Sequence, residues 1–249
     1  MNTLGKRNRH APVDEENPYW MSFSDIMAGL LVIFVLAAIA LIVELTQKSS
    51  EWDKQIEEIA KAQEVRKNLL YEVEQELKAQ NITVKISDND TVLRIPDDVL
   101  SFKQGSFELP TDGHQNIALV IGEVLHAAIV KEERWRYLDT IFIEGHTDKV
   151  IYRDKRIKGN WGLSTFRAIS VWNFWNEKME QGQRLEDIYN HDGNRLFSVS
   201  GYAETRPDKE TEADPDSEEN LRKNRRIDIR ITVRRPALEE YKEIKARLN

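Results

Sequence analysis

The 249-residue chain contains no cysteine. This absence excludes disulfide bridges, thiolate metal ligands and cysteine nucleophiles. The chain also lacks a glycine-rich phosphate loop, a nucleophile paired with a base, and an internal repeat. Its formal net charge of −7 at pH 7 disfavours a general nucleic-acid surface, because binding to phosphates requires a basic face. We therefore expect a binding protein rather than an enzyme, without a cofactor.

One long segment, Ile26 to Val43, has no charged and no strongly polar residue, whereas the rest of the chain is rich in charge. Its 18 residues would form a helix about 27 Å long, close to the roughly 30 Å of a bilayer's hydrocarbon core. A buried helix of a soluble protein and a cleaved signal peptide are the alternatives. The cleavage-like triplet at residues 38–40 lies inside the apolar run, which is also longer than a usual signal core. We therefore expect an uncleaved, single-pass anchor.

The start of this helix is predicted at Asn17 and Pro18, with the asparagine as N-cap and the proline at the first helical position. We expect residues 1–16 to form a cytoplasmic tail and residues 17–46 to form the transmembrane helix. Basic residues on the two sides of the span nearly balance, so the charge rule does not fix the orientation. Because the folded mass lies C-terminal, we place the N-terminus inside the cell.

A single carboxylate, Asp25, lies at the entrance of the apolar run. It could cap the helix, or it could carry a proton. If the helix starts at Pro18, Asp25 lies two turns inside it, where a cap is no longer needed. An ionised carboxylate within the bilayer costs roughly 2.5–3.5 kcal/mol, so such a residue tends to face protein or water and to have a function. From the residues alone, a structural role and a proton-carrying role for Asp25 remain equally open.

Residues 47–80 are charged and favour a helical linker, in which seam residues recur at spacings of four and three. This seam fits a paired helix in a dimer, and it fits equally a single helix that packs on the next domain. The seam consists of Trp52, Ile56, Ile59, Gln63, Arg66, Leu70, Val73 and Leu77.

Beyond Asn81, strands and helices alternate. Two β-rich runs flank residues 88–90, whose Asp-Asn-Asp sequence predicts a hairpin. Helical periodicity follows in "TDGHQNIALVIGEVLHAAIV" and in "LSTFRAISVWNFWNEKM", where Ser164 is a candidate N-cap. Further strands are expected in "LDTIFIEGHTD", "RLFSVSGY" and "RRIDIRITV". This order predicts an α+β sandwich over residues 81–236, with helices on one face of a mixed sheet.

Two segments at the end of the chain are predicted separately. The segment "RPDKETEADPDSEE" is typical of a solvated acidic loop. Apolar residues at helical spacing after residue 236 predict a short tail helix over residues 237–249.

Five motifs appear in the order found in OmpA-like peptidoglycan-binding domains: "LSFKQGSFEL", "IEGHTD", "NWGLSTFRAISV", "GYAETRP" and "NLRKNRRIDI". This resemblance covers roughly residues 98–233. An acidic transmembrane helix, a helical linker and this domain together resemble MotB, the wall-anchored subunit of flagellar stators. The segment "SFSDIMAGLLVIFVL" is closer to the MotB-like subunits of the Zorya antiphage defence system. The resemblance implies a homodimer within a ring of a larger, multi-span ZorA-like partner, forming a motor in the inner membrane with the proton as coupling ion.

The resemblance also implies a periplasmic site for the diaminopimelate of the peptidoglycan stem peptide. The family's aspartate and arginine fall on Asp148 and Arg167. They suit this ligand because diaminopimelate presents an ammonium for the carboxylate and a carboxylate for the guanidinium fork. Further candidate residues are Asn160, Thr147, Leu163, Ser164 and Arg225. The segment "KVIYRDKRIKG" before Asn160 is longer and more basic than the family pattern, which leaves the placement of this loop open.

Alternatives remain for these residues and for the whole chain. Glu144, His146 and Asp148 alternate along a strand and could ligate a metal, but no second histidine-rich segment completes such a site, and we expect none. His146 and Asp148 could instead satisfy backbone groups. The alternative functions are a flagellar MotB-type stator subunit, a static membrane-to-wall tether without ion transport, and an energiser of outer-membrane transport.

Overall fold

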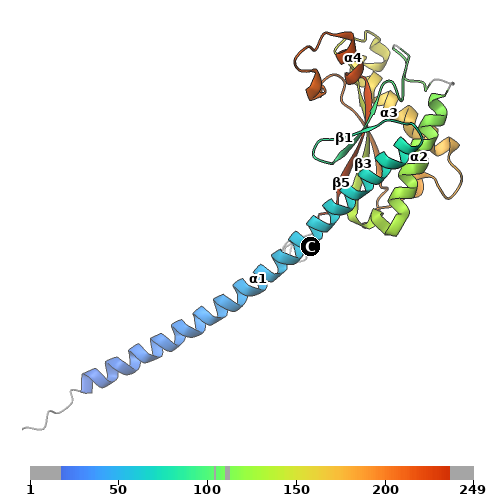
Figure 1. The fold of residues 1–249 in the computed structure, drawn as a ribbon. Coiled ribbons are helices and arrows are strands. Elements are labelled where there is room, and N and C mark those ends of the chain that lie inside the picture. The colour runs from blue at the N-terminus through green and yellow to red at the C-terminus, as the bar shows by residue number, and fades with distance from the viewer. Residues whose placement is uncertain (1–17, 104, 110–112, 236–249) are drawn as a thin grey trace, which may run out of the picture. The chain divides into compact units, whose positions relative to one another are not determined.

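The computed structural model describes residues 18–103, 105–109 and 113–235. The predicted N-terminal tail, the Asn17 cap and the tail helix over residues 237–249 lie outside these residues. The chain divides into two units, one ending at Lys54 and the other beginning at Gln55. Figure 1 labels the helices and strands, whose bounds are given below.

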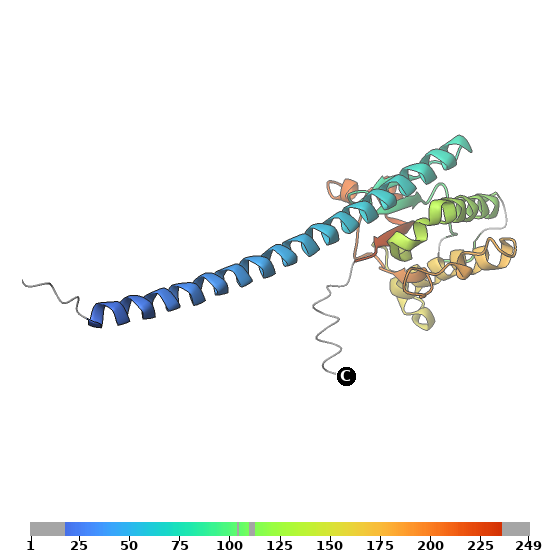
Figure 2. The ribbon, with the colours of Figure 1, turned by 90° about the horizontal axis from the view of Figure 1, so that it is seen from below.

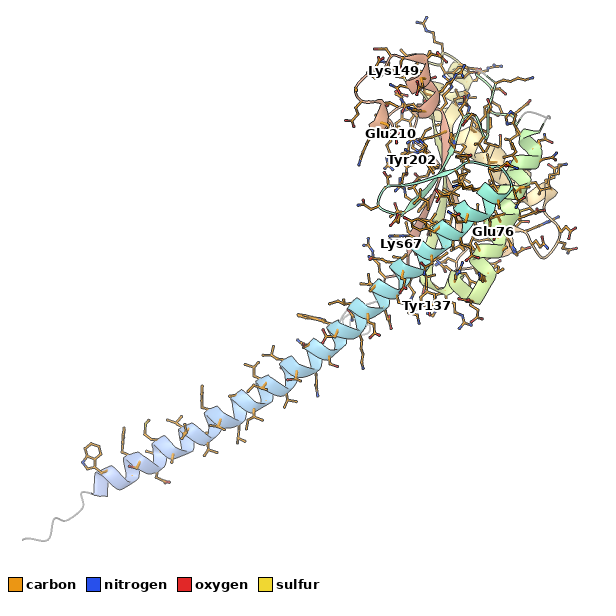
Figure 3. All side chains as sticks on the ribbon, viewed as in Figure 1. Lys67, Glu76, Tyr137, Lys149, Tyr202 and Glu210 are labelled. Atoms are coloured by element: carbon orange, nitrogen blue, oxygen red, sulfur yellow. The ribbon has the colours of Figure 1, made fainter. Side chains whose placement is uncertain are left out.

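Helix α1 (Pro18–Ala79) contains both the predicted span and the predicted linker. Pro18 is helical, as predicted, and is also the first residue that the structure describes. Asp25 therefore lies about two turns inside α1, so its interpretation as a helix cap is wrong. Among the described residues, α1 is the one helix long and apolar enough to cross a membrane. Figure 3 shows the side chains of α1 projecting from the helix in the first unit. The large apolar side chains there are exposed.

The second unit is built on a five-stranded sheet with the order β1-β2-β5-β3-β4. Its strands are β1 (Lys85–Ser87), β2 (Val92–Pro96), β3 (Leu138–His146), β4 (Phe197–Gly201) and β5 (Arg226–Val233). Strands β3 and β4 run parallel and the other neighbours antiparallel, which confirms a mixed sheet. The predicted hairpin is confirmed between β1 and β2, where residues 88–90 adopt positive φ angles.

The remaining helices are α2 (His114–Val130), α3 (Gly159–Lys178) and α4 (Glu218–Asn224), with short 3-10 helices η1 (Lys131–Tyr137), η2 (Lys155–Ile157), η3 (Leu185–Asp187) and η4 (Lys209–Thr211). Helix α2 begins inside its predicted segment, whereas α3 begins before its predicted segment, at Gly159. Lys158, in the left-handed region, precedes the first residue of α3. Ser164 therefore lies inside α3, and its assignment as the N-cap is wrong.

The apolar core lies between one face of the sheet and the helices, as predicted. Helices α2 and α3 and the end of α1 share this face (Figure 2). Leu70, Val73 and Leu77 of α1 are fully buried in the core, whereas Ile56 is 64% exposed. The last part of the seam is therefore a single helix packed on its own domain. The core includes Leu69, Ile121, Leu125, Ile129, Ile141, Ile143, Val171, Trp175, Ile227 and Ile229.

The opposite face of the sheet carries charged residues, because alternate side chains of a strand point to opposite sides. The segment after β4 covers part of this face. Asp208 in that segment is buried and accepts a hydrogen bond from Arg94 at 2.7 Å. Figure 3 labels Glu210 and Lys149, which form ion pairs with Lys85 and Asp216, respectively. Most of the acidic loop is exposed, as predicted, whereas Asp208 and Thr211 are buried.

Candidate functional site

A pocket of about 350 Å³ lies beside the carboxyl end of β3, the first turns of α3, and α4. Six of the seven predicted wall-binding residues line it, and Ser164 does not. The lining comprises Asp97, Phe102, Gly105, Thr147, Asp148, Val150, Ile151, Tyr152, Asn160, Leu163, Arg167, Glu218, Leu221 and Arg225.

Two glycines allow α3 to approach the strand ends that carry this pocket. A Cβ atom at Gly145 would lie 1.9 Å from the Ser164 carbonyl oxygen, and one at Gly201 would lie 2.3 Å from the Thr165 hydroxyl. Ser164 is fully buried, and its hydroxyl accepts a hydrogen bond from the Ala203 N–H at 3.0 Å. Ser164 therefore holds α3 against the turn after β4, which is a positioning role.

Asp148 lies two residues beyond the end of β3, and its carboxylate has two partners. Oδ1 accepts a hydrogen bond from the Val150 N–H at 3.0 Å, as the backbone-satisfying interpretation predicted. Oδ2 accepts one from Nη1 of Arg225 at 2.7 Å. This second contact is a short, charge-assisted hydrogen bond, so in this structure Asp148 already holds a cationic group.

Arg167 is 3% exposed and reaches the pocket from α3. Its Nε donates to the Ser106 carbonyl oxygen at 3.0 Å, and its guanidinium carbon lies 5.1 Å from the centre of the Phe102 ring. Burial lowers the pKa of Arg167 below its ordinary value, although the charge of Asp97 partly opposes this. In the described parts of the chain, Arg167 forms no ion pair with a carboxylate. A buried cation without a paired anion is costly, so this guanidinium is suited to an external anion.

Asn160, in the first turn of α3, fixes the loop that follows Asp148. Its Oδ1 accepts from the Tyr152 N–H at 2.9 Å, and its Nδ2 donates to the Val150 carbonyl oxygen at 3.1 Å. Nδ2 also donates to Oε2 of Glu204 at 3.0 Å. The long basic loop is therefore held against α3 by an amide that both gives and accepts hydrogen bonds.

Thr147 and Leu163 complete the predicted part of the lining. The Thr147 backbone N–H donates to the Ala203 carbonyl oxygen at 2.9 Å, while its buried hydroxyl has no partner among the described residues. Leu163 is 5% exposed and contributes an apolar wall. The pocket thus offers a positive, a negative, a neutral polar and an apolar surface to a ligand.

Sequence reasoning missed Asp97, Phe102 and Tyr152. Phe102 belongs to a motif quoted for the resemblance, and Tyr152 to the loop that departs from the family pattern, but aromatic residues carry no charge that would single them out. Asp97 follows β2 and lies outside every motif. Its carboxylate is 3.6 Å from Nε of Arg225, and burial raises its pKa above the ordinary value.

The metal interpretation of Glu144, His146 and Asp148 does not hold. Asp148 pairs with Arg225, and Asp228 instead joins the other two on the charged face of the sheet. Burial, followed by the charges of Arg226, Arg94, Arg206 and Arg230, lowers the pKa of His146 to about 2. The carboxylates of this cluster are engaged by arginines, Glu144 with Arg230 and Asp228 with Arg94 and Arg226.

His146 does not satisfy backbone groups either. Neither ring nitrogen has a hydrogen-bond partner among the described residues, and the ring instead stacks on Tyr202 with centroids 5.4 Å apart. Of the other two arginines near the end of α4, Arg226 is buried and donates to Asp228, whereas Arg222 is an exposed partner of Glu218.

Comparison with known proteins finds a family match that covers most of the residues lining this pocket, but not Asp97 or Arg225. The OmpA family profile matches residues 101–222. Over 147 residues the chain is 25% identical to the Zorya protein ZorB of Escherichia coli O139:H28 (strain E24377A / ETEC). This alignment covers 59% of the chain and 57% of that protein, so the chain spans little more than half of its relative's length.

Several solved structures are similar to the chain. A MotB-like protein from Desulfovibrio vulgaris is 21% identical, with a TM-score of 0.49 and coverage of 71% of this chain and 99% of that one. The cell wall anchor of the T6SS from Pseudomonas aeruginosa is 24% identical, with a TM-score of 0.44 and coverage of 68% and 99%. The periplasmic domain of Helicobacter pylori MotB (residues 78–256) is 20% identical, with a TM-score of 0.42 and coverage of 66% and 88%.

Proposed function

We propose that this chain, which matches the OmpA family and is similar to the Zorya protein ZorB, is a membrane-anchored, peptidoglycan-binding subunit of stator type. Its apolar helix crosses the inner membrane once, with the N-terminus in the cytoplasm and the domain in the periplasm. It acts in a proton-driven motor of antiphage defence. Its partners are a second copy of itself and a ZorA-like multi-span ring subunit.

The wall-binding part of the proposal rests on the surroundings of the Arg167 guanidinium. This guanidinium is almost fully buried, lines a pocket beside Asp148, and has no carboxylate partner in the described chain. A ligand carboxylate would supply the missing charge through the bidentate geometry that arginine favours. Diaminopimelate fits because it adds an ammonium, for which Asp148 is the nearby acceptor. Thr147 offers its hydroxyl to the same ligand, and Asn160 and Leu163 shape the site.

Retention on purified peptidoglycan tests this assignment. We expect Arg167→Ala and Asp148→Ala to lose retention, each by at least about tenfold, because each leaves one ligand charge unpaired (1.4 kcal/mol corresponds to tenfold). Arg222→Ala is the matched control, since Arg222 is an exposed arginine outside the pocket lining. Equal retention of all three variants and of the unaltered chain would contradict a wall-binding pocket.

The motor part of the proposal depends on Asp25. This carboxylate lies inside α1 at the start of its apolar run, where a charged state and a neutral state favour different surroundings. We propose that Asp25 takes a proton arriving from the periplasm and releases it inward while the wall contact holds the subunit still. Each proton that crosses the membrane supplies roughly 2.3 kcal/mol per 100 mV.

Phage protection and proton flux measured with Asp25→Asn test this mechanism, because asparagine keeps the size and removes the titration. We expect both to be lost while peptidoglycan retention is unchanged. Protection that persists without proton flux would favour a static tether. A chain that restores motility rather than protection would favour the flagellar alternative.

Binding rather than cleavage is the role proposed for the periplasmic domain. Its pocket presents two arginines and two aspartates, and the charges of Asp148 and Arg225 are engaged with each other. Such an arrangement recognises a charged ligand but provides no activated nucleophile.

A further inference from the structure

Arg167 and Asp148, the two charged groups expected to hold the ligand, differ in whether they already have a partner of opposite charge. Arg167 has no carboxylate partner in the described chain, whereas Asp148 accepts a 2.7 Å hydrogen bond from Arg225. The pocket can therefore accept an anion at Arg167 directly, whereas Asp148, its site for a cation, is already occupied by Arg225. An ammonium group that reaches Asp148 must displace a guanidinium.

Arg225 has other carboxylates within reach. Its Nε lies 3.6 Å from Oδ2 of Asp97, and its Nη2 lies 3.4 Å from Oε1 of Glu218. Asp97 is the better acceptor, because its side chain is 18% exposed against 68% for Glu218, and buried charges attract more strongly. Burial alone would lower the pKa of Arg225, but its bond to Asp148 and the charge of Asp97 raise it overall.

The backbone at Arg225 is fixed, so a movement of this residue can be confined to its side chain. Its N–H donates to the carbonyl oxygens of Leu221 and Arg222 at the end of α4, and β5 begins at the next residue. A guanidinium on a flexible stem can rotate from Asp148 toward Asp97 without unfolding either element.

We propose that Arg225 occupies the ammonium site of the empty pocket, and that Asp97 receives Arg225 when a ligand's ammonium binds Asp148. This inference rests on the wall-binding function proposed above and adds two positioning residues to it. Asp97 and Arg225 both lie outside residues 101–222, the range that matches the OmpA family.

This exchange determines which ligands the pocket accepts. Three carboxylates, Asp97, Asp148 and the more exposed Glu218, and two guanidiniums, Arg167 and Arg225, line the pocket, so its charges nearly balance. A ligand end with one ammonium and one carboxylate keeps that balance. A simple amine would have to displace Arg225 without any contact to Arg167 in return, so the pocket discriminates against amines that lack a carboxylate.

Three synthetic stem peptides that differ at one residue separate these contributions. The first contains diaminopimelate, the second replaces its free amino group with hydrogen, and the third contains lysine, which lacks the carboxylate. Dissociation constants are measured by calorimetry with the full chain in detergent. For the unaltered chain we expect the first two peptides to bind within a few-fold of each other and the lysine peptide to bind far more weakly.

The deciding quantity is the preference for the first peptide over the second, measured as the ratio of their dissociation constants. Arg225→Met should raise this preference about tenfold, because the ammonium then meets an unoccupied Asp148 and the gain is that of one charge-assisted hydrogen bond. Asp97→Asn should lower the preference, because Arg225 then has no buried acceptor to move to. Arg222→Met is the control and should leave the preference unchanged.

Each outcome has a distinct meaning. A preference that is unchanged or reduced in Arg225→Met overturns the exchange while leaving the wall-binding proposal intact. Failure of the unaltered chain to bind any of the three peptides overturns both proposals. Binding of the second peptide by Arg225→Met shows that this variant is folded. If Arg225→Met does not fold, the exchange is judged from Asp97→Asn, and an unchanged preference in that variant overturns it.

Discussion

The two units of this chain use the same kinds of residue in opposite ways. In the first unit the large apolar side chains of α1 are exposed, and the carboxylate of Asp25 stands at the start of their apolar run. In the second unit the apolar side chains are buried, and charged groups such as Asp228 and Arg226 are buried with them in pairs. The difference indicates that the first unit suits an apolar environment such as lipid, whereas the second satisfies most of its charges internally.

The largest expected effect concerns the paired charges of the second unit. Asp228 accepts hydrogen bonds from Arg94 and Arg226, so Asp228→Ala leaves buried guanidinium groups without this anion. We expect a loss of about 3–5 kcal/mol in the free energy of unfolding, measured by urea titration. Asp216→Ala removes an exposed partner of Lys149 and should cost less than about 1 kcal/mol. Similar losses in both variants would show that burial does not decide the value of these pairs.

A somewhat smaller effect is expected when a charge is placed in the first unit. Leu36, 60% exposed, lies in the middle of the apolar run. Leu36→Lys should oppose membrane insertion by about 2.5–3.5 kcal/mol, and so reduce the carbonate-resistant membrane fraction relative to Leu36→Ala. An unchanged fraction would argue that this surface of α1 does not face lipid.

An effect of about 2 kcal/mol is expected from the pH dependence of His146. Its pKa is about 2 in the folded chain, against the ordinary 6.5, because the ring is buried among arginines. As the pH falls below about 6.5, the unfolded chain binds a proton that the folded chain refuses, so stability is lost at about 1.4 kcal/mol per pH unit. Between pH 6.5 and 5 this amounts to about 2 kcal/mol, and above pH 6.5 the contribution is constant.

Thermal or urea unfolding at several pH values checks the slope. His146→Phe keeps a ring that can stack on Tyr202 but cannot titrate, so its stability should fall less steeply below pH 6.5. Parallel curves for the variant and the unaltered chain would refute the assignment of this pH dependence to His146.

The smallest effect on stability is expected at Ile56, which is apolar but exposed. Ile56→Gln should change the free energy of unfolding by no more than about 0.5 kcal/mol, because the side chain has little contact with the domain. If two copies of α1 pair along this seam, the same change should weaken self-association, measured by analytical ultracentrifugation in detergent. Leu70→Gln, at a fully buried position of the same seam, should instead lower stability.

Patterns of local sequence predicted most of the fold. The hairpin follows from its Asp-Asn-Asp turn, and α2 and β3 follow from their apolar periodicity. The N-cap of α3 was misplaced because its helix begins after Lys158, whose left-handed conformation is not a feature that a cap pattern predicts. Ser164 resembles a cap in sequence, yet it bonds across to a different segment.

The pocket was predicted less completely, because its partners come from distant parts of the chain. Asp148 and Arg167 stand in motifs, but the pairing of Arg225 with Asp97 depends on β2 lying next to β5. The charged face of the sheet was missed for the same reason. Glu144, His146 and Asp228 become neighbours through the pairing of β3 with β5, a register that the residues of either strand alone do not reveal.

The hydrogen bonds of Asn160 have a consequence for the thermodynamics of recognition. One amide ties the loop after β3 to Glu204, beyond the end of β4, so these walls of the pocket are set before any ligand arrives. A preformed site loses little conformational entropy on association. Binding should therefore leave the backbone around the pocket largely unchanged and move chiefly the Arg225 side chain, with selectivity expressed mainly in the dissociation rate of the ligand.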